Sequence, residues 1–162
     1  PHTELLIRGK AGKPVEFGHK VLLAQTNEKF IHHYAVLPQR KEDKDLLDGT
    51  LQAHKKLFGD LPKVLATDKG FYQSMDQIRV LEETIPTVSM CKKGRRTAGE
   101  IARESTEAFK EGQRFRAGCE GSISVLKRAF KLGKCLLKGF KHYAASIGLA
   151  VFCHNLVVLT RL

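Results

Sequence analysis

The sequence predicts an α/β fold in which a mixed sheet is flanked by helices. Short apolar runs alternate with amphipathic stretches in the order strand, strand, helix, strand, helix, strand, helix, helix. The chain has 162 residues, of which 42% are hydrophobic and 28% charged, and this suits ordinary globular material. The length leaves little room for a second domain. We therefore expect one domain over residues 1–162.

The first part of the chain predicts a strand hairpin. A basic lead-in over residues 8–13 is followed by two β-type runs, residues 20–24 and 30–36. The polar segment 26–29 between the runs favours a turn, and Pro38 ends the second strand.

A helix and a buried strand are expected next. Apolar residues recur about once per helical turn over residues 43–58, and Gly59 is a plausible stop. Residues 63–67 are short and apolar, which is typical of a buried strand. Ser74 and Gln77 have the spacing of a capping box that opens another helix.

The second half predicts one more strand and then helices. The strand covers residues 87–90, and Thr97 with Glu100 forms a second capping box before a helix to about Phe109. A long helical stretch is expected over residues 120–131, and an apolar helix closes the chain.

Positive charge is concentrated in the second half of the chain. Lys and Arg exceed Asp and Glu by 28 − 17 = +11 overall. Residues 1–90 carry 13 basic and 12 acidic side chains, whereas residues 91–162 carry 15 and 5, a net +10. This asymmetry favours a polyanionic partner.

Other features narrow the cellular setting. The N-terminus shows no signal-peptide pattern, and His154 and Asn155 interrupt the apolar run 143–159, which favours a buried helix over a membrane span. The cysteines at 91, 119, 135 and 153 have no paired spacing, so a reducing cytoplasm is expected. The chain opens at Pro1 in ordered-looking sequence, and we expect it to be a piece of a longer protein.

Asp68 is the first candidate site residue. It ends an apolar strand, and the carboxyl end of a central strand is where α/β folds place ligands. Gly70 permits a sharp exit from that strand. The alternative is that Asp68 only caps a turn.

Glu120 is the second candidate. On a helix, Glu120 and Lys127 share one face, and we expect the stripe to continue through Lys131 and Lys134. A carboxylate at the start of such a helix can hold a divalent cation while the lysines neutralise phosphate. The alternative is an amphipathic helix with a solvated basic face.

A basic loop is a further candidate for phosphate contact. It carries Lys92, Lys93, Arg95 and Arg96 around a glycine. Solvated surface charge explains such a loop equally well.

Four segments resemble the catalytic domain of bacterial insertion-sequence transposases of the DDE class. They are the glycine-lysine lead-in at 8–21, the motif Ala66-Thr67-Asp68-Lys69-Gly70-Phe71, the pattern Arg116-x3-Glu120-x6-Lys127, and Asn155-Leu156 in the last helix. The likeness spans essentially the whole chain, and the second and third segments together are fairly specific.

The resemblance implies an RNase H-like core in which three carboxylates hold two Mg²⁺ (or Mn²⁺) ions for DNA cleavage and strand transfer. Asp68 would be the second acid and Glu120 the third. Arg116 would orient the glutamate or touch DNA. Lys127, Arg128, Lys131, Lys134 and the basic loop would contact DNA phosphates. The resemblance further implies a bacterial cytoplasmic, nucleoid-associated protein, DNA as partner, a possible homodimer, and no membrane.

Two positions depart from the family pattern. Gln113 stands where the family has a tyrosine. The family's first aspartate belongs to a strand before the lead-in, and the nearby acids, Glu4 and Glu16, do not match its context. We therefore expect the first core strand and its acid to be absent, and this chain alone to be inactive.

Two other functions stay open. One is a non-catalytic DNA-binding remnant of a transposase, which would use the same basic surface without cutting. The other is a basic RNA-binding protein, which would need aromatic side chains exposed on a sheet for base stacking.

Overall fold

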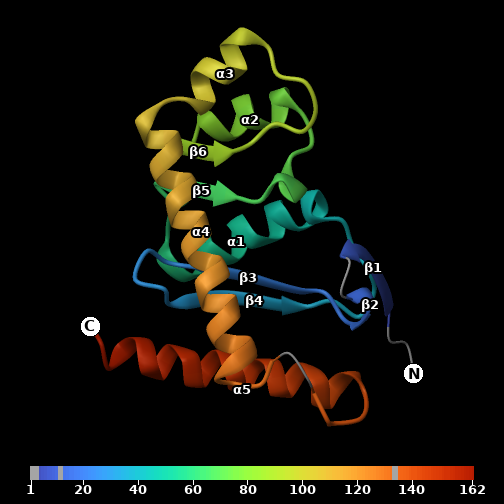
Figure 1. The fold of residues 1–162 in the computed structure, drawn as a ribbon. Coiled ribbons are helices and arrows are strands. Elements are labelled where there is room, and N and C mark those ends of the chain that lie inside the picture. Colours follow the sequence, from blue (N-terminus) through green and yellow to red (C-terminus); the bar gives the residue numbers. More distant parts are fainter. Residues whose placement is uncertain (1–3, 11–12, 133–134) are drawn as a thin grey trace. The chain divides into compact units, whose positions relative to one another are not determined.

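The computed structural model describes residues 4–10, 13–132 and 135–162, with side chains described for 18–132 and 135–162. Strands and helices alternate along the chain, which confirms the mixed α/β class predicted from the sequence (Figure 1). Contacts group the chain into two compact units. The central unit is Glu42–Ile123, and the terminal unit combines the described residues up to Lys41 with those from Ser124 onward. The expectation of one domain stays a prediction.

Hydrogen bonds join the described strands in pairs rather than in the one mixed sheet that the sequence predicts. The apolar residues of β3–β4 and of β5–β6 belong to separate core clusters, so each pair is stabilised by its own helices. The bounds are β1 (Glu4–Lys10), β2 (Lys13–Gly18), β3 (Val21–Gln25), β4 (Ile31–Val36), β5 (Val64–Thr67) and β6 (Thr87–Met90).

The terminal unit begins with two antiparallel hairpins. Strands β1 and β2 fall where the sequence predicts only a lead-in, because charges and glycines at 8–13 obscure the apolar residues on either side. Strands β3 and β4 confirm the second hairpin to within one residue. The Thr26 N–H donates to the Phe30 carbonyl at 2.8 Å and the Lys29 N–H to the Thr26 carbonyl at 3.0 Å, closing the turn between them.

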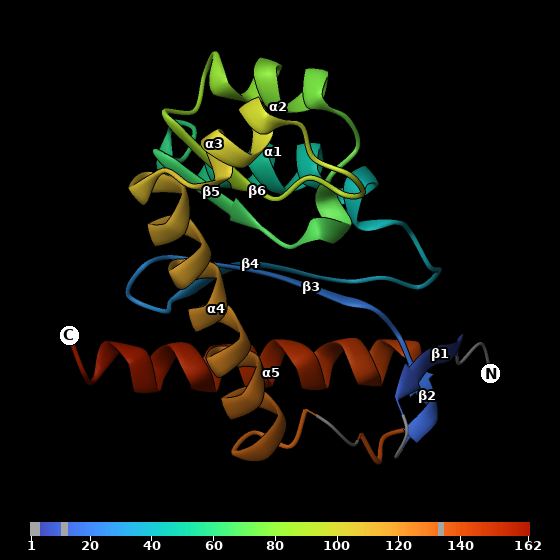
Figure 2. The same cartoon turned by 45° about the horizontal axis from the view of Figure 1, so that its top comes forward.

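Helix α5 (Phe140–Leu159) lies beside β4 (Figures 1 and 2). The Asn155 side chain binds the backbone of Ile31 twice: its Oδ1 accepts from the N–H and its Nδ2 donates to the carbonyl, both at 2.9 Å. By length and composition this helix is apolar enough to cross a membrane, a test that buried core helices also pass. The core of the terminal unit is formed by Ile31, Leu126, Ile147, Ala150 and Val151.

The central unit contains the parallel strands β5 and β6, which lie side by side in Figure 1. Its first helices are η1 (Asp43–Leu46), α1 (Leu47–Phe58), η2 (Lys69–Phe71) and α2 (Met75–Glu82). Gly59 ends α1 as predicted, with a left-handed φ of 83° and its N–H donating to the Lys55 carbonyl at 2.8 Å. The core is formed by Leu47, Ile78, Ile85, Val88 and Met90.

The two capping boxes predicted from the sequence differ in outcome. Thr97 and Glu100 form the complete box at the start of α3 (Ala98–Glu104). Ser74 Oγ accepts from the Gln77 N–H at 3.1 Å, but Gln77 Oε1 accepts from the Gln73 N–H instead of the Ser74 N–H. The Ser74–Gln77 box is therefore half formed.

The helix expected to reach Phe109 stops at Glu104, and a new helix, α4 (Glu107–Arg128), begins well before residue 120. The break occurs because Thr106 Oγ1 accepts from the Phe109 N–H at 3.4 Å, as an N-cap does. The prediction that Glu120 starts a helix is therefore wrong, since it lies in the interior of α4.

The basic stripe expected beyond Lys127 is interrupted. Helix α4 ends at Arg128, and Lys131 has a left-handed φ of 55°, so it does not continue the helical face. The chain turns there because Phe130 and Leu132 pack against the core of the terminal unit. Lys134 lies outside the described residues.

Candidate functional site

Asp68 directly follows β5 and is exposed. Its Oδ1 accepts from the Lys69 N–H at 2.6 Å, so it caps η2 as the simpler of the two interpretations predicts. The cap occupies one carboxylate oxygen with one hydrogen bond, and the side chain remains accessible to a ligand.

Gly70 allows a close approach beside this turn. A Cβ on Gly70 would lie 2.2 Å from Asp43 Oδ2, so any larger residue at that position would require the Asp43 carboxylate to move. A second carboxylate therefore lies against the loop that carries Asp68. The sequence gives no signal for it, because Asp43 is 25 residues earlier in the chain and belongs to the turn before α1.

The parallel ladder brings Asp68 and Cys91 to the same end. Thr67 pairs with Met90, so the residues after them leave the carboxyl ends of adjacent strands together. Burial raises the pKa of the Cys91 thiol and the Glu104 carboxylate adds to this, while Lys69 and Arg116 act in the opposite direction.

Arg116 and Glu120 form an ion pair on α4. Arg116 Nη1 donates to Glu120 Oε1 at 2.9 Å, across one helical turn. The Glu120 side chain is 69% exposed and that of Arg116 is 28% exposed. The arginine thus holds one carboxylate oxygen while the glutamate stays open to solvent.

Gln113 connects this pair to the sheet. Its Nε2 donates to the Ser89 carbonyl at 2.7 Å and lies 3.0 Å from Ser89 Oγ, and its Oε1 accepts from Arg116 Nε at 3.2 Å. Sequence reasoning treats Gln113 as a departure from a family pattern and misses this role. The i, i+3 spacing of Gln113 and Arg116 on a helix was the available signal.

Asp68 lies at the carboxyl end of β5, and Glu120 lies on α4, whose Gln113 is bound to β6. Lys69, next to Asp68, and Arg116, bound to Glu120, both influence Cys91. Carboxylate oxygens are ligands that Mg²⁺ binds, so Asp68 and Glu120 have the chemistry for a cation. Within the described part of the chain, no group of three or more His, Cys, Asp or Glu side chains is arranged to hold a metal ion.

The cations of the basic loop fall into two classes that the sequence does not separate. Lys92 Nζ binds both Glu100 oxygens at 2.7 and 2.8 Å, and Arg96 Nη1 binds Glu104 Oε2 at 2.7 Å. Lys93 and Arg95 are exposed. The exposed pair is the better placed to meet a phosphate.

The cations at the end of α4 are also exposed. Lys127 and Arg128 occupy its last turn, and Lys131 lies beyond it. These side chains are accessible to a polyanion, although the helix does not align all of them.

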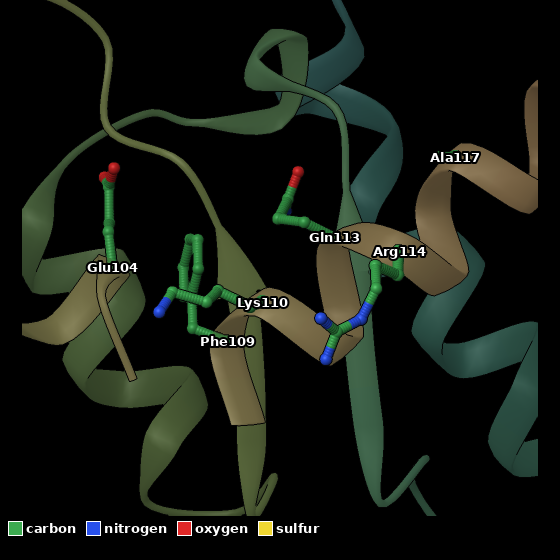
Figure 3. Close-up of a pocket in the computed structure, with 6 residues that line it drawn as sticks. All are labelled: Glu104, Phe109, Lys110, Gln113, Arg114 and Ala117. Carbon is green, nitrogen blue, oxygen red and sulfur yellow. The ribbon is translucent and has the colours of Figure 1, made fainter. Parts of the chain in front are cut away.

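A surface depression of about 440 Å³ lies along the first turns of α4, beside the end of α3 (Figure 3). Gln113 and Arg114 leave the helix there in different directions (Figure 3). Neither Asp68 nor Glu120 lines the depression, so it is separate from the acidic candidates. Its lining residues are Glu104, Phe109, Lys110, Gln113, Arg114 and Ala117.

Comparisons with protein-family models, with curated proteins and with solved structures give no match to this chain.

Proposed function

We propose that this chain is part of an RNase H-like DDE transposase catalytic domain that acts on DNA phosphodiesters with Mg²⁺ or Mn²⁺. In this proposal Asp68 and Glu120 bind the cation and Arg116 orients Glu120. The observation that carries the proposal is a series of contacts: Thr67, which precedes Asp68, pairs with Met90, and Gln113 links the neighbouring Ser89 to Arg116. These contacts connect the Asp68 motif, through β6, with the Arg116–Glu120 pair, which is far from it in sequence.

Electrostatics support a DNA substrate. The net charge of +10 over residues 91–162 attracts polyanions, and Lys93, Arg95, Lys127 and Arg128 are exposed there. When bound, the divalent ions would activate water or a 3′-hydroxyl for in-line attack on phosphorus. The protein's part is to hold the ions with carboxylates and to neutralise the DNA backbone with lysine and arginine.

A complete two-metal site in this family needs a third carboxylate. The notable acid beside the Asp68 loop is Asp43, which packs against Gly70. We propose Asp68 and Glu120 alone as the cation ligands of this chain, and we expect them to bind one divalent ion weakly.

The test is Mn²⁺ binding by the chain, measured from the loss of the free-ion electron paramagnetic resonance signal. Asp68→Asn and Glu120→Gln should each abolish binding. Asp76→Asn on α2 and Glu111→Gln on α4 remove the same charge from exposed positions, so they should leave binding unchanged.

Nicking of supercoiled DNA with Mg²⁺ or Mn²⁺ is then assayed for this chain and for a chain extended by any coding sequence upstream of Pro1. Cleavage that persists in Asp68→Asn or Glu120→Gln removes the assigned roles. If the chain binds DNA and neither variant changes Mn²⁺ binding, the result supports the non-catalytic remnant instead.

A further inference from the structure

We infer that Gln113 is a positioning residue that fixes the Arg116 guanidinium against Glu120. The inference deepens the proposed function and rests on it for the cation that Glu120 would bind. It assigns a task to the position at which this chain departs from the family's tyrosine.

Ser89 of β6 anchors the Gln113 side chain. Ser89 is fully buried in β6, and its Oγ donates to the Phe109 carbonyl at 2.7 Å. The Gln113 amide donates to the Ser89 carbonyl at 2.7 Å. Because both partners of this bond belong to packed elements, the Gln113 side chain has a defined orientation.

The anchored Gln113 amide in turn binds Arg116. With Nε2 committed to Ser89, Oε1 of the same amide is directed to Arg116 Nε, at 3.2 Å. Arg116 then has two contacts, Nε to Gln113 and Nη1 to Glu120, and the planar guanidinium is fixed at two of its donors.

Arg116 restricts the Glu120 carboxylate. Arg116 engages only Oε1 of a side chain that is 69% exposed. An exposed glutamate on a helix otherwise samples several rotamers, and ordering it on cation binding costs free energy. A fixed guanidinium restricts the carboxylate before the cation arrives.

Glutamine has both the donor and the acceptor that these two contacts need. A glutamine supplies both a donor for the Ser89 carbonyl and an acceptor for Arg116 Nε. A glutamate keeps the acceptor and loses the donor, and a leucine loses both. A comparison of glutamine, glutamate and leucine at position 113 therefore separates the effect of the Ser89 contact from that of the Arg116 contact.

The experiment uses the 162-residue chain and has two arms. In the first, ¹⁵N nuclear magnetic resonance follows solvent exchange of the Arg116 Nε–H, identified by its absence from Arg116→Lys. Gln113→Leu should speed this exchange about tenfold, the equivalent of one lost hydrogen bond. Gln113→Glu should keep the slow exchange although it lowers the melting temperature.

Ser89→Ala is the matched control for stability. It removes the Ser89 hydroxyl, with its bond to the Phe109 carbonyl and its 3.0 Å contact with Gln113 Nε2, but leaves the shorter bond of Gln113 to the Ser89 carbonyl and the Arg116 contact in place. It should destabilise the fold without speeding Arg116 exchange. Unchanged exchange in Gln113→Leu overturns the inference.

In the second arm the dissociation constant for Mn²⁺ is measured. Gln113→Leu should raise it about tenfold, the size usual for groups that orient a metal ligand, and Ser89→Ala should not. An unchanged constant with altered exchange also overturns the inference, because the positioning then has no effect at Glu120. If the unmodified chain binds no Mn²⁺, the proposed function fails, and the first arm still decides whether Gln113 positions Arg116.

Discussion

Gly112 of α4 lies against Ser89 of β6 so closely that a Cβ on Gly112 would come 2.4 Å from Ser89 Cβ and 2.8 Å from its Oγ. Ala66 of β5 is the next neighbour, 3.8 Å from the same point. The helix backbone therefore approaches both parallel strands at this one residue. This approach brings Gln113, the next residue, within hydrogen-bonding reach of the Ser89 carbonyl.

Gly112→Ala should destabilise the central unit by about 1–3 kcal/mol, the range for overpacking a filled core. The added methyl meets a buried side chain that is held by its own hydrogen bond to Phe109, so it has little freedom to move. Gly118→Ala on the same helix meets nothing within 4 Å and should stabilise by about 1 kcal/mol through helix propensity. Chemical denaturation of both variants checks the prediction, which fails if their effects have the same sign.

Asn155→Ala should leave the Ile31 N–H and carbonyl without their side-chain partner. The loss of these two hydrogen bonds should destabilise the terminal unit by about 2 kcal/mol. Amide exchange at Ile31 is the direct measurement and should become faster. Phe152→Ala removes an exposed side chain from the same helix and should leave that amide protected. Equal protection of the Ile31 amide in Asn155→Ala and the unmodified chain would contradict the predicted role.

Glu100→Gln should destabilise the chain at neutral pH and have a smaller effect in acid. The hydrogen bond from Lys92, followed by that from the Thr97 backbone, holds the pKa of Glu100 below its ordinary value of 4.5. A lowered folded-state pKa gives stability that is present above 4.5 and is lost as the pH falls through the folded value. The melting temperatures of Glu100→Gln and the unmodified chain, measured from neutral to acid pH, should therefore converge at the acid end. Parallel curves would contradict a stabilising Lys92–Glu100 ion pair.

The exposed cations of the basic loop should contribute more to DNA binding than the paired ones. Lys93→Ala and Arg95→Ala should each flatten the salt dependence of DNA affinity by about one charge. Lys92→Ala should instead lower the melting temperature, because it leaves the Glu100 carboxylate, only 14% exposed, without its ammonium. Lys55→Ala, on α1, is the charge-matched control. Equal salt slopes for Lys92→Ala and Lys93→Ala would refute the distinction.

Local signals in the sequence were sufficient for most of the described elements. Gly59 ends α1 because only a residue that tolerates positive φ fits there, and Thr97 with Glu100 closes a complete capping box. The single helix predicted over residues 97–109 was wrong for a local reason as well. Ser105 and Thr106 separate α3 from α4, whereas the apolar periodicity alone predicts one continuous helix. The pairing of strands depends on contacts between distant residues, which periodicity does not specify.

The candidate site was predictable only in part. Asp68 and Glu120 stand in motifs, and the resemblance to the transposase pattern names Arg116 beside Glu120. The sequence could not reveal that Asp43 packs against Gly70, nor that Gln113 reaches Ser89, because both depend on how separate elements pack. It also could not separate Lys92 from Lys93, whose different surroundings are created by α3.

Lys29 and Lys131 are the two residues other than glycine, within the described ranges, whose backbone has a left-handed φ, of 69° and 55°. This conformation costs an L-amino acid with a Cβ roughly 1–2 kcal/mol. Replacing Lys131 by glycine would make the protein more robust to heat and would at the same time discard one cation. A single substitution at position 131 would therefore raise thermal stability and lower the affinity for a polyanion.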